Sequence, residues 1–156
     1  MIVYCAHNTS RLQYIIDFFS KELFDAPIMI TTNRAEFDQT AGPKINYSDS
    51  PSTDAFNLRP TELLFGSGVT LQSITCFLHS GRKVFFPTEG DLPFDIFAAA
   101  FYLLSRYEEY LPHTLDEYGR FAHTNSLAWR ENFLDLPLVN YWLQDLRVTL
   151  ARKIVY

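Results

Sequence analysis

The chain has 156 residues, of which 47% are hydrophobic and 20% charged, and its formal net charge is −5 at pH 7. This length is typical of one domain that buries about two-thirds of its unfolded surface, so residues 1–156 are expected to form a single domain. The acidic balance, with no run of five Lys or Arg, argues against a nucleic-acid-binding surface.

The first residues lack both the basic stretch and the long apolar stretch of a secretion signal. No apolar run approaches the roughly 18 residues that cross a bilayer. We therefore expect no membrane span and a cytoplasmic location.

The opening of the chain predicts a β-α-β unit. Residues 2–6 form a short apolar run, and residues 28–32 are rich in β-branched side chains. Between them, residues 11–24 carry apolar side chains at i, i+3, i+4, i+7 and i+11, which is one stripe of an amphipathic helix. Its members are Leu12, Ile15, Ile16, Phe19 and Leu23.

The middle of the chain is more polar and holds shorter elements. Residues 44–48 alternate like a half-exposed strand, and residues 49–54 are typical of a loop. The next apolar runs lie at residues 63–65, 73–78 and 83–87, with a hairpin-like turn at residues 79–82. These pieces predict a mixed sheet whose middle strands are antiparallel neighbours.

The most informative segment spans residues 91–111. Its first two-thirds is apolar on every side, which predicts a buried helix. Asp91 is the expected N-cap, with Asp95 as the second choice, and Pro112 stops the helix. An ordered loop with one short helical turn is expected at residues 113–133. A last amphipathic helix then starts near Pro137, capped by Asp135.

Together these elements predict an α/β or α+β fold. A mixed sheet of about five or six strands is flanked by about three main helices.

Charged residues gather at the end of the apolar helix. On a helix Arg106 and Glu109 stand at i, i+3, and Ser105 and Glu109 at i, i+4, so these side chains can face one another, while Glu108 can reach the following loop. One interpretation is a carboxylate–guanidinium site in which Glu108 or Glu109 acts as acid or base. The favoured interpretation is structural, because paired structural carboxylates outnumber catalytic ones. The candidate polar cluster comprises Asp95, Ser105, Arg106, Glu108, Glu109 and Arg130.

Aromatic residues surround the same region and form a candidate sugar-stacking surface, with satellite core packing as the alternative. They are Tyr107, Tyr110, Tyr118 and Trp129. The four histidines show no metal-ligand spacing, and no phosphate loop or nucleophile motif occurs. We therefore expect no catalytic residue, metal or other cofactor in this chain.

The segment at residues 92–110, which reads LPFDIFAAAFYLLSRYEEY, resembles an uncharacterised bacterial domain that precedes the catalytic domain of polysaccharide-deacetylase-like proteins. Further stretches share the resemblance: residues 44–48, 63–65, 116–121, 126–130 and 136–139. The resemblance implies an N-terminal accessory domain of a longer protein. Its partner would be a downstream deacetylase domain in the same polypeptide, and polysaccharide is a second candidate partner.

Deacetylases of that class hold a metal with an Asp and two His at i, i+4, a pair that this sequence lacks, so no catalytic residue is carried over. Three functions are thus in view. The first is a non-catalytic accessory domain in glycan deacetylation. The alternatives are a carbohydrate-binding module that uses Tyr, Trp, Arg and Glu, and an independent hydrolase that uses Glu108 and Glu109.

Overall fold

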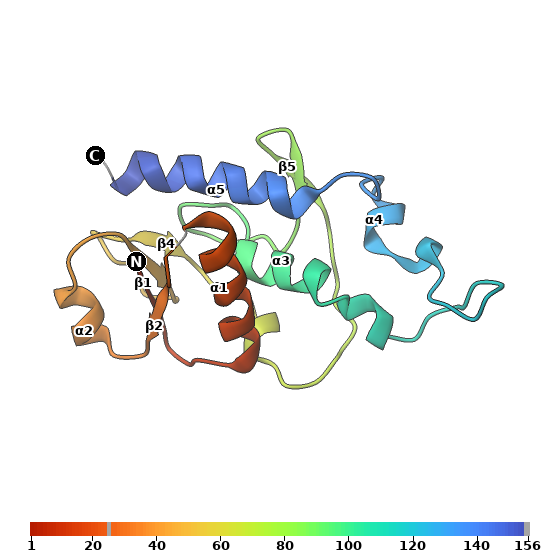
Figure 1. The fold of residues 1–156 in the computed structure, drawn as a ribbon, viewed down its shortest axis with the longest axis horizontal. Helices are drawn as coiled ribbons and strands as arrows, with labels where there is room; N and C mark the ends of the chain where they lie inside the picture. The colour runs from red at the N-terminus through yellow and green to blue at the C-terminus, as the bar shows by residue number, and fades with distance from the viewer. Residues whose placement is uncertain (25, 155–156) are drawn as a thin grey trace.

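The computed structural model describes residues 1–24 and 26–154 (Figure 1). The strands are β1 (Ile2–Cys5), β2 (Met29–Thr31), β3 (Lys44–Tyr47), β4 (Phe56–Leu58), β5 (Phe77–His79) and β6 (Arg82–Val84). The helices are α1 (Ser10–Leu23), α2 (Arg34–Gln39), α3 (Ile96–Leu104), α4 (Leu127–Arg130) and α5 (Leu138–Ile154). Three 3₁₀ turns complete the set: η1 (Leu63–Phe65), η2 (Tyr107–Tyr110) and η3 (His123–Asn125).

The main sheet has four parallel strands in the order β2-β1-β3-β4. Strands β5 and β6 form a separate antiparallel hairpin, as the turn at residues 79–82 predicts. The α/β class is therefore confirmed, but the expectation that all strands share one mixed sheet is wrong. The segment between β6 and α3 passes beside β4, but it forms only an isolated antiparallel bridge there, between Leu58 and Gly90.

Gly90 explains why that approach does not grow into a fifth strand. Its φ of 135° lies in a region that other residues rarely adopt. A Cβ at this position would also lie 2.6 Å from the carbonyl oxygen of Asn57. The close passage past β4 thus requires glycine, and the turned backbone ends the pairing after one bridge.

Helix α1 begins and packs as its sequence predicts. Thr9 is the N-cap, and its hydroxyl accepts a hydrogen bond from the Leu12 amide at 3.2 Å. All five residues of the predicted stripe are buried: Leu12, Ile15, Ile16, Phe19 and Leu23. The β1-α1-β2 opening of the chain is therefore confirmed.

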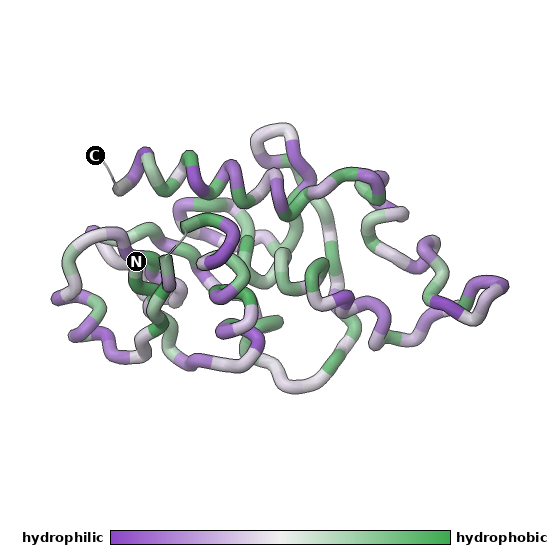
Figure 2. The backbone as a smooth tube through the Cα atoms, in the orientation of Figure 1, coloured by the Kyte–Doolittle hydropathy of each residue, from purple (hydrophilic) through white to green (hydrophobic). Residues whose placement is uncertain are grey.

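The core lies between one face of the sheet and helices α1, α3 and α5, which contact one another there. Figure 2 shows α3 hydrophobic along its length, while hydrophobic and hydrophilic residues alternate along α5. The buried face of α5, which was predicted to be an amphipathic helix, supplies Trp142. This residue is 1% exposed, and its side-chain N–H donates to the carbonyl of Lys83 at 3.1 Å. Its ring also meets Phe85 and Phe94 at centroid distances of 5.6 and 5.4 Å.

Helix α3 differs from its prediction at both ends. Asp95, not Asp91, is the N-cap, and its carboxylate accepts from the Ala98 amide at 3.1 Å. The helix stops at Leu104 rather than near residue 111, because Arg106 adopts a left-handed conformation with φ of 55°. This turn lets the Tyr107 ring enter the core, where its hydroxyl bonds the backbone of Thr70.

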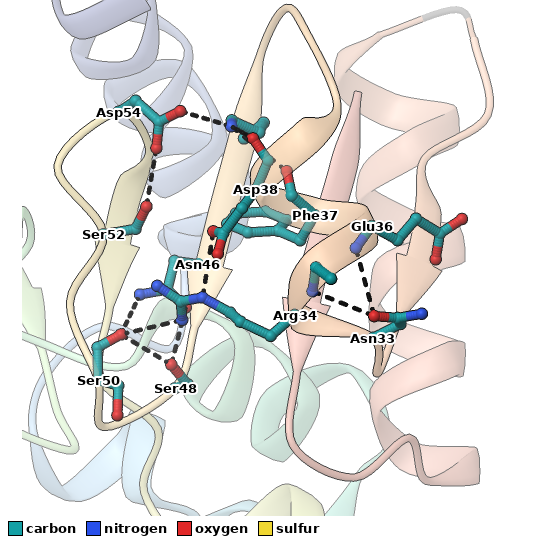
Figure 3. A network of polar contacts seen from close by, with 12 residues as sticks. Asn33, Arg34, Glu36, Phe37, Asp38, Asn46, Ser48, Ser50, Ser52 and Asp54 are labelled. Atoms are coloured by element: carbon teal, nitrogen blue, oxygen red, sulfur yellow. Dashed lines mark hydrogen bonds and ion pairs between the residues drawn. The ribbon is translucent and has the colours of Figure 1, made fainter.

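The second face of the sheet is covered by α2, which the sequence analysis missed together with β4. Strand β3 was expected to be half-exposed, yet all four of its residues are buried. Lys44 is 3% exposed because its ammonium group pairs with Asp54 at 2.6 Å and donates to the carbonyl of Phe37. Figure 3 shows this polar network, in which Asn46 and Arg34 bind the loop that joins β3 to β4.

Residues 111–137, which we call the arm, project from the body between α3 and α5 (Figure 1). The arm holds η3 and α4, in agreement with the ordered loop and short helical turn expected there. Within residues 1–24 and 26–154, none of the helices combines the length and the hydrophobicity needed to cross a membrane.

Candidate functional site

The predicted polar cluster is divided among separate places. Asp95 is buried at the start of α3, whereas Ser105, Arg106, Glu108 and Glu109 follow its end. Arg130 reaches the same region as Glu108 from α4. The cluster is therefore not one site.

Arg106 and Glu109 form the ion pair that their spacing predicts, at 2.6 Å. The Arg106 side chain is 74% exposed, so this pair lies at the surface, where such pairs contribute little to stability. The expectation that Ser105 faces Glu109 is wrong. The Ser105 hydroxyl is buried and has no hydrogen-bond partner in the part of the chain that the structure describes.

Glu108 joins α3 to α4. Its carboxylate accepts from the Tyr102 hydroxyl at 3.1 Å and from the Leu127 amide at 2.8 Å. Burial, with the neighbouring Glu108 charge, raises the pKa of Tyr102 well above its usual range. Glu108 and Arg130 also line a polar cleft of about 530 Å³ at the base of the arm.

The four candidate aromatic residues do not form one surface. Tyr107 is 3% exposed and belongs to the core, which contradicts the expected stacking surface at this position. Tyr110, Tyr118 and Trp129 are exposed. Tyr118 lies under the Arg120 guanidinium, and no two of the four rings stack on one another within residues 1–24 and 26–154.

A larger crevice lies where the sequence analysis named no site, beyond the carboxyl ends of β1, β3 and β4. Its volume is about 590 Å³. Strand β1 has β2 as its neighbour on one side and β3 on the other. The chain runs from β1 through α1 to β2 and then crosses back to β3, so the strand order of the sheet reverses at β1 and β3. Ligands of open parallel sheets bind at such a position. The lining residues are Ala6, His7, Tyr47, Ser48, Asp49, Pro60, Thr61, Glu62, Phe65 and Gly66.

The floor of this crevice is fixed by buried contacts. The rings of Tyr47 and Phe65 stack with centroids 6.0 Å apart. The Tyr47 hydroxyl donates to the Asp95 carboxylate at 2.8 Å, and Thr61 donates to the same oxygen through its amide at 2.8 Å and its hydroxyl at 2.9 Å. Burial raises the pKa of Asp95 and that of Tyr47.

The rim of the crevice is acidic. Asp49 and Glu62 are exposed there, and His7 lies at the end of β1. The neighbouring basic groups are already bound: Arg59 pairs with Asp49 at 3.1 Å, and Arg11 donates to two backbone carbonyls of the residue 63–68 turn. In the described part of the chain, no three His, Cys, Asp or Glu side chains are grouped as metal ligands.

One sequence signal could have located the crevice. Polar residues follow two buried strands closely, His7 two residues after the end of β1 and Ser48-Asp49 directly after β3. The carboxyl ends of parallel strands meet at one edge, so these residues converge. The parallel pairing of β1 with β3 was not predicted, because the middle strands were expected to be antiparallel neighbours of one another, so the two turns were not placed at one edge.

No curated protein and no solved structure is significantly similar to this chain. One family model matches residues 1–155, and its description is a family of unknown function, DUF7033. The match covers the β1-α1-β2 opening, the crevice and the arm alike. The chain therefore belongs to the DUF7033 family of unknown function.

Proposed function

We propose that this chain is a non-catalytic accessory domain associated with glycan deacetylation, and that it packs against a deacetylase domain of the same polypeptide. The sequence resemblance of residues 92–110 motivates the deacetylase partner. The observation that carries the proposal is an apolar docking surface at the root of the arm.

This docking surface is a shallow groove of about 320 Å³ between the end of α3 and the start of α5. Leu103 and Leu104 of α3 form one wall, and Leu134 and Leu136 are 51% and 50% exposed on the other. Adjacent exposed apolar side chains of this size mark protein–protein contact sites more often than single exposed residues do.

The two carboxylates on which the hydrolase alternative depends, those of Glu108 and Glu109, already bind other groups of the protein. Glu108 accepts two hydrogen bonds from protein groups, and Glu109 is paired with Arg106. These contacts favour a structural role for both residues, as expected for an accessory domain.

The docking proposal is tested with the polypeptide that contains this chain and the deacetylase domain. Hydrogen exchange of residues 128–139 is compared in the chain alone and in the two-domain protein. We expect slower exchange at these amides and a higher Tm for the chain when the deacetylase domain is attached. Equal exchange with and without the second domain, or a gene that encodes no deacetylase domain, overturns the proposal.

Two variants locate the contact. Leu134→Asp combined with Leu136→Asp is expected to abolish the gain in protection, because two carboxylates would be buried against the partner. Leu78→Asp is the matched control, since Leu78 is 70% exposed on the β5–β6 hairpin and lines no part of the groove. A control that loses as much protection as the double variant places the contact elsewhere.

A further inference from the structure

We propose that the crevice beyond β1, β3 and β4 binds a hexosamine unit of a glycan, with the protonated amine at its acidic rim. This inference rests on the proposed function, because hydrolysis of an N-acetyl amide yields acetate and the free amine of such a sugar. It adds a binding site and a ligand class to a domain otherwise assigned only a docking role.

The position and size of the crevice suit a small ligand. It lies where the strand order of the parallel sheet reverses, and its volume of about 590 Å³ is within the roughly 300–1,000 Å³ of ligand sites. Phe65, whose ring stacks on the buried ring of Tyr47, forms an apolar wall. Phe65 remains partly exposed in the crevice, where its ring can pack on the C–H face of a sugar.

Apart from His7, whose imidazole can both donate and accept, the polar side chains of the crevice offer mainly acceptors. The Ser48 hydroxyl donates to the Asn46 side chain at 2.7 Å, and the Thr61 hydroxyl donates to Asp95 at 2.9 Å. The protons of both hydroxyls are therefore committed to the protein, and their remaining lone pairs can accept. Asp49 and Glu62 add carboxylates, which only accept when ionised.

An acceptor-rich crevice selects a ligand that is rich in donors. A hexosamine offers an ammonium group and several hydroxyls, all of which can donate to these oxygens. Phosphate and carboxylate ligands are disfavoured, because the Glu62 carboxylate repels them. The nearby guanidinium groups are already bound, Arg59 by Asp49 and Glu89 and Arg11 by two backbone carbonyls. N-acetylation removes the positive charge and adds bulk, so the deacetylated sugar is the preferred form.

The test is calorimetric titration of the chain at pH 6 with three tetrasaccharides: β-1,4-linked glucosamine, its fully N-acetylated form, and cellotetraose. We expect the glucosamine tetramer to bind at least tenfold more tightly than the other two. Its affinity should fall as salt is added, because the charge interaction at the rim is screened. Absence of glucosamine binding, or equal affinity for all three, overturns the inference.

Variants place the ligand in the crevice. Glu62→Gln removes one rim charge and is expected to weaken glucosamine binding at least fivefold, and Phe65→Ala removes the stacking wall and is expected to weaken all sugar binding. Glu117→Gln, on the exposed arm, is the matched charge control and should leave affinity unchanged. Amide chemical-shift changes centred on His7 and Gly66 are expected in the wild-type chain.

Other outcomes separate this inference from its alternatives. Binding that survives Glu62→Gln and Phe65→Ala but disappears in Trp129→Ala would overturn the crevice site in favour of the exposed aromatic residues. The paired variant Leu134→Asp and Leu136→Asp should leave sugar affinity unchanged, and Glu62→Gln should leave arm protection unchanged. Failure of docking and failure of sugar binding are thus observed in different experiments.

Discussion

Replacing Asp95 with alanine tests whether the buried carboxylate joins α3 to the floor of the crevice. The side chain is fully buried and accepts hydrogen bonds from four groups. Loss of an N-cap costs about 1 kcal/mol, and each buried donor left without an acceptor costs about 1–3 kcal/mol. Removal of the desolvated charge offsets part of this, so we expect a net loss of about 3 kcal/mol.

The assay is urea unfolding at pH 7 followed by far-ultraviolet circular dichroism, with the free energy of unfolding obtained by linear extrapolation. Tyr47→Phe alone should cost about 1 kcal/mol, because one of the donors is removed cleanly. The double variant Asp95→Ala with Tyr47→Phe should lose about 1–2 kcal/mol less than the sum of the two single losses, since the two residues share a hydrogen bond. A loss below about 1 kcal/mol for Asp95→Ala, or strict additivity, would refute the reasoning.

Three further outcomes are expected. Burial raises the pKa of Asp95 above its ordinary 3.8, so the part of the stability that depends on protonation of this carboxyl is complete below pH 3.8 and is lost as the pH rises through the folded-state pKa. The hydrogen bonds that the ionised carboxylate accepts remain at pH 7. The difference in unfolding free energy between wild type and Asp95→Asn should therefore shrink from pH 3 to pH 7 in urea melts, and a growing difference would contradict it. Lys44→Met should cost about 1–3 kcal/mol and return the pKa of Asp54, which the Lys44 ammonium lowers, toward its ordinary value in a carbon-detected NMR titration. Burial raises the pKa of Cys5 and of Cys76 to about 11, so both thiols should react with an aromatic disulfide reagent at pH 8 at least tenfold more slowly than in urea.

Local patterns predicted the elements that depend on a single stripe or turn. The stripe of α1 was identified because it repeats over three turns, and the β5–β6 hairpin because Ser80 and Gly81 favour its left-handed turn. Strand β4 was missed because its three residues lie in a polar stretch and lack the β-branched side chains that identified the equally short β2. The burial of β3 was also missed, because a lysine in a strand indicates an exposed position. Lys44 is buried because its ammonium group binds Asp54 and the carbonyls of Phe37 and Asp38, contacts that the sequence does not indicate.

The sites were predicted less well than the elements because they depend on topology. Arg106 and Glu109 are close in sequence and pair as expected, but Asp95 acts with Tyr47 and Thr61, which lie 48 and 34 residues away. Nothing in the apolar segment that starts at Ile96 indicates the left-handed turn at Arg106. That turn separates the charged residues and carries Tyr107 into the core.

The two tryptophans lie in different environments, so their intrinsic fluorescence reports on different parts of the chain. Trp142 is held among aromatic rings and should emit at short wavelength until the fold opens, whereas Trp129, 47% exposed on the arm, should emit at long wavelength and respond to collisional quenchers. A quencher such as acrylamide can therefore separate the signal of a covered arm from that of an opened interior without any added label.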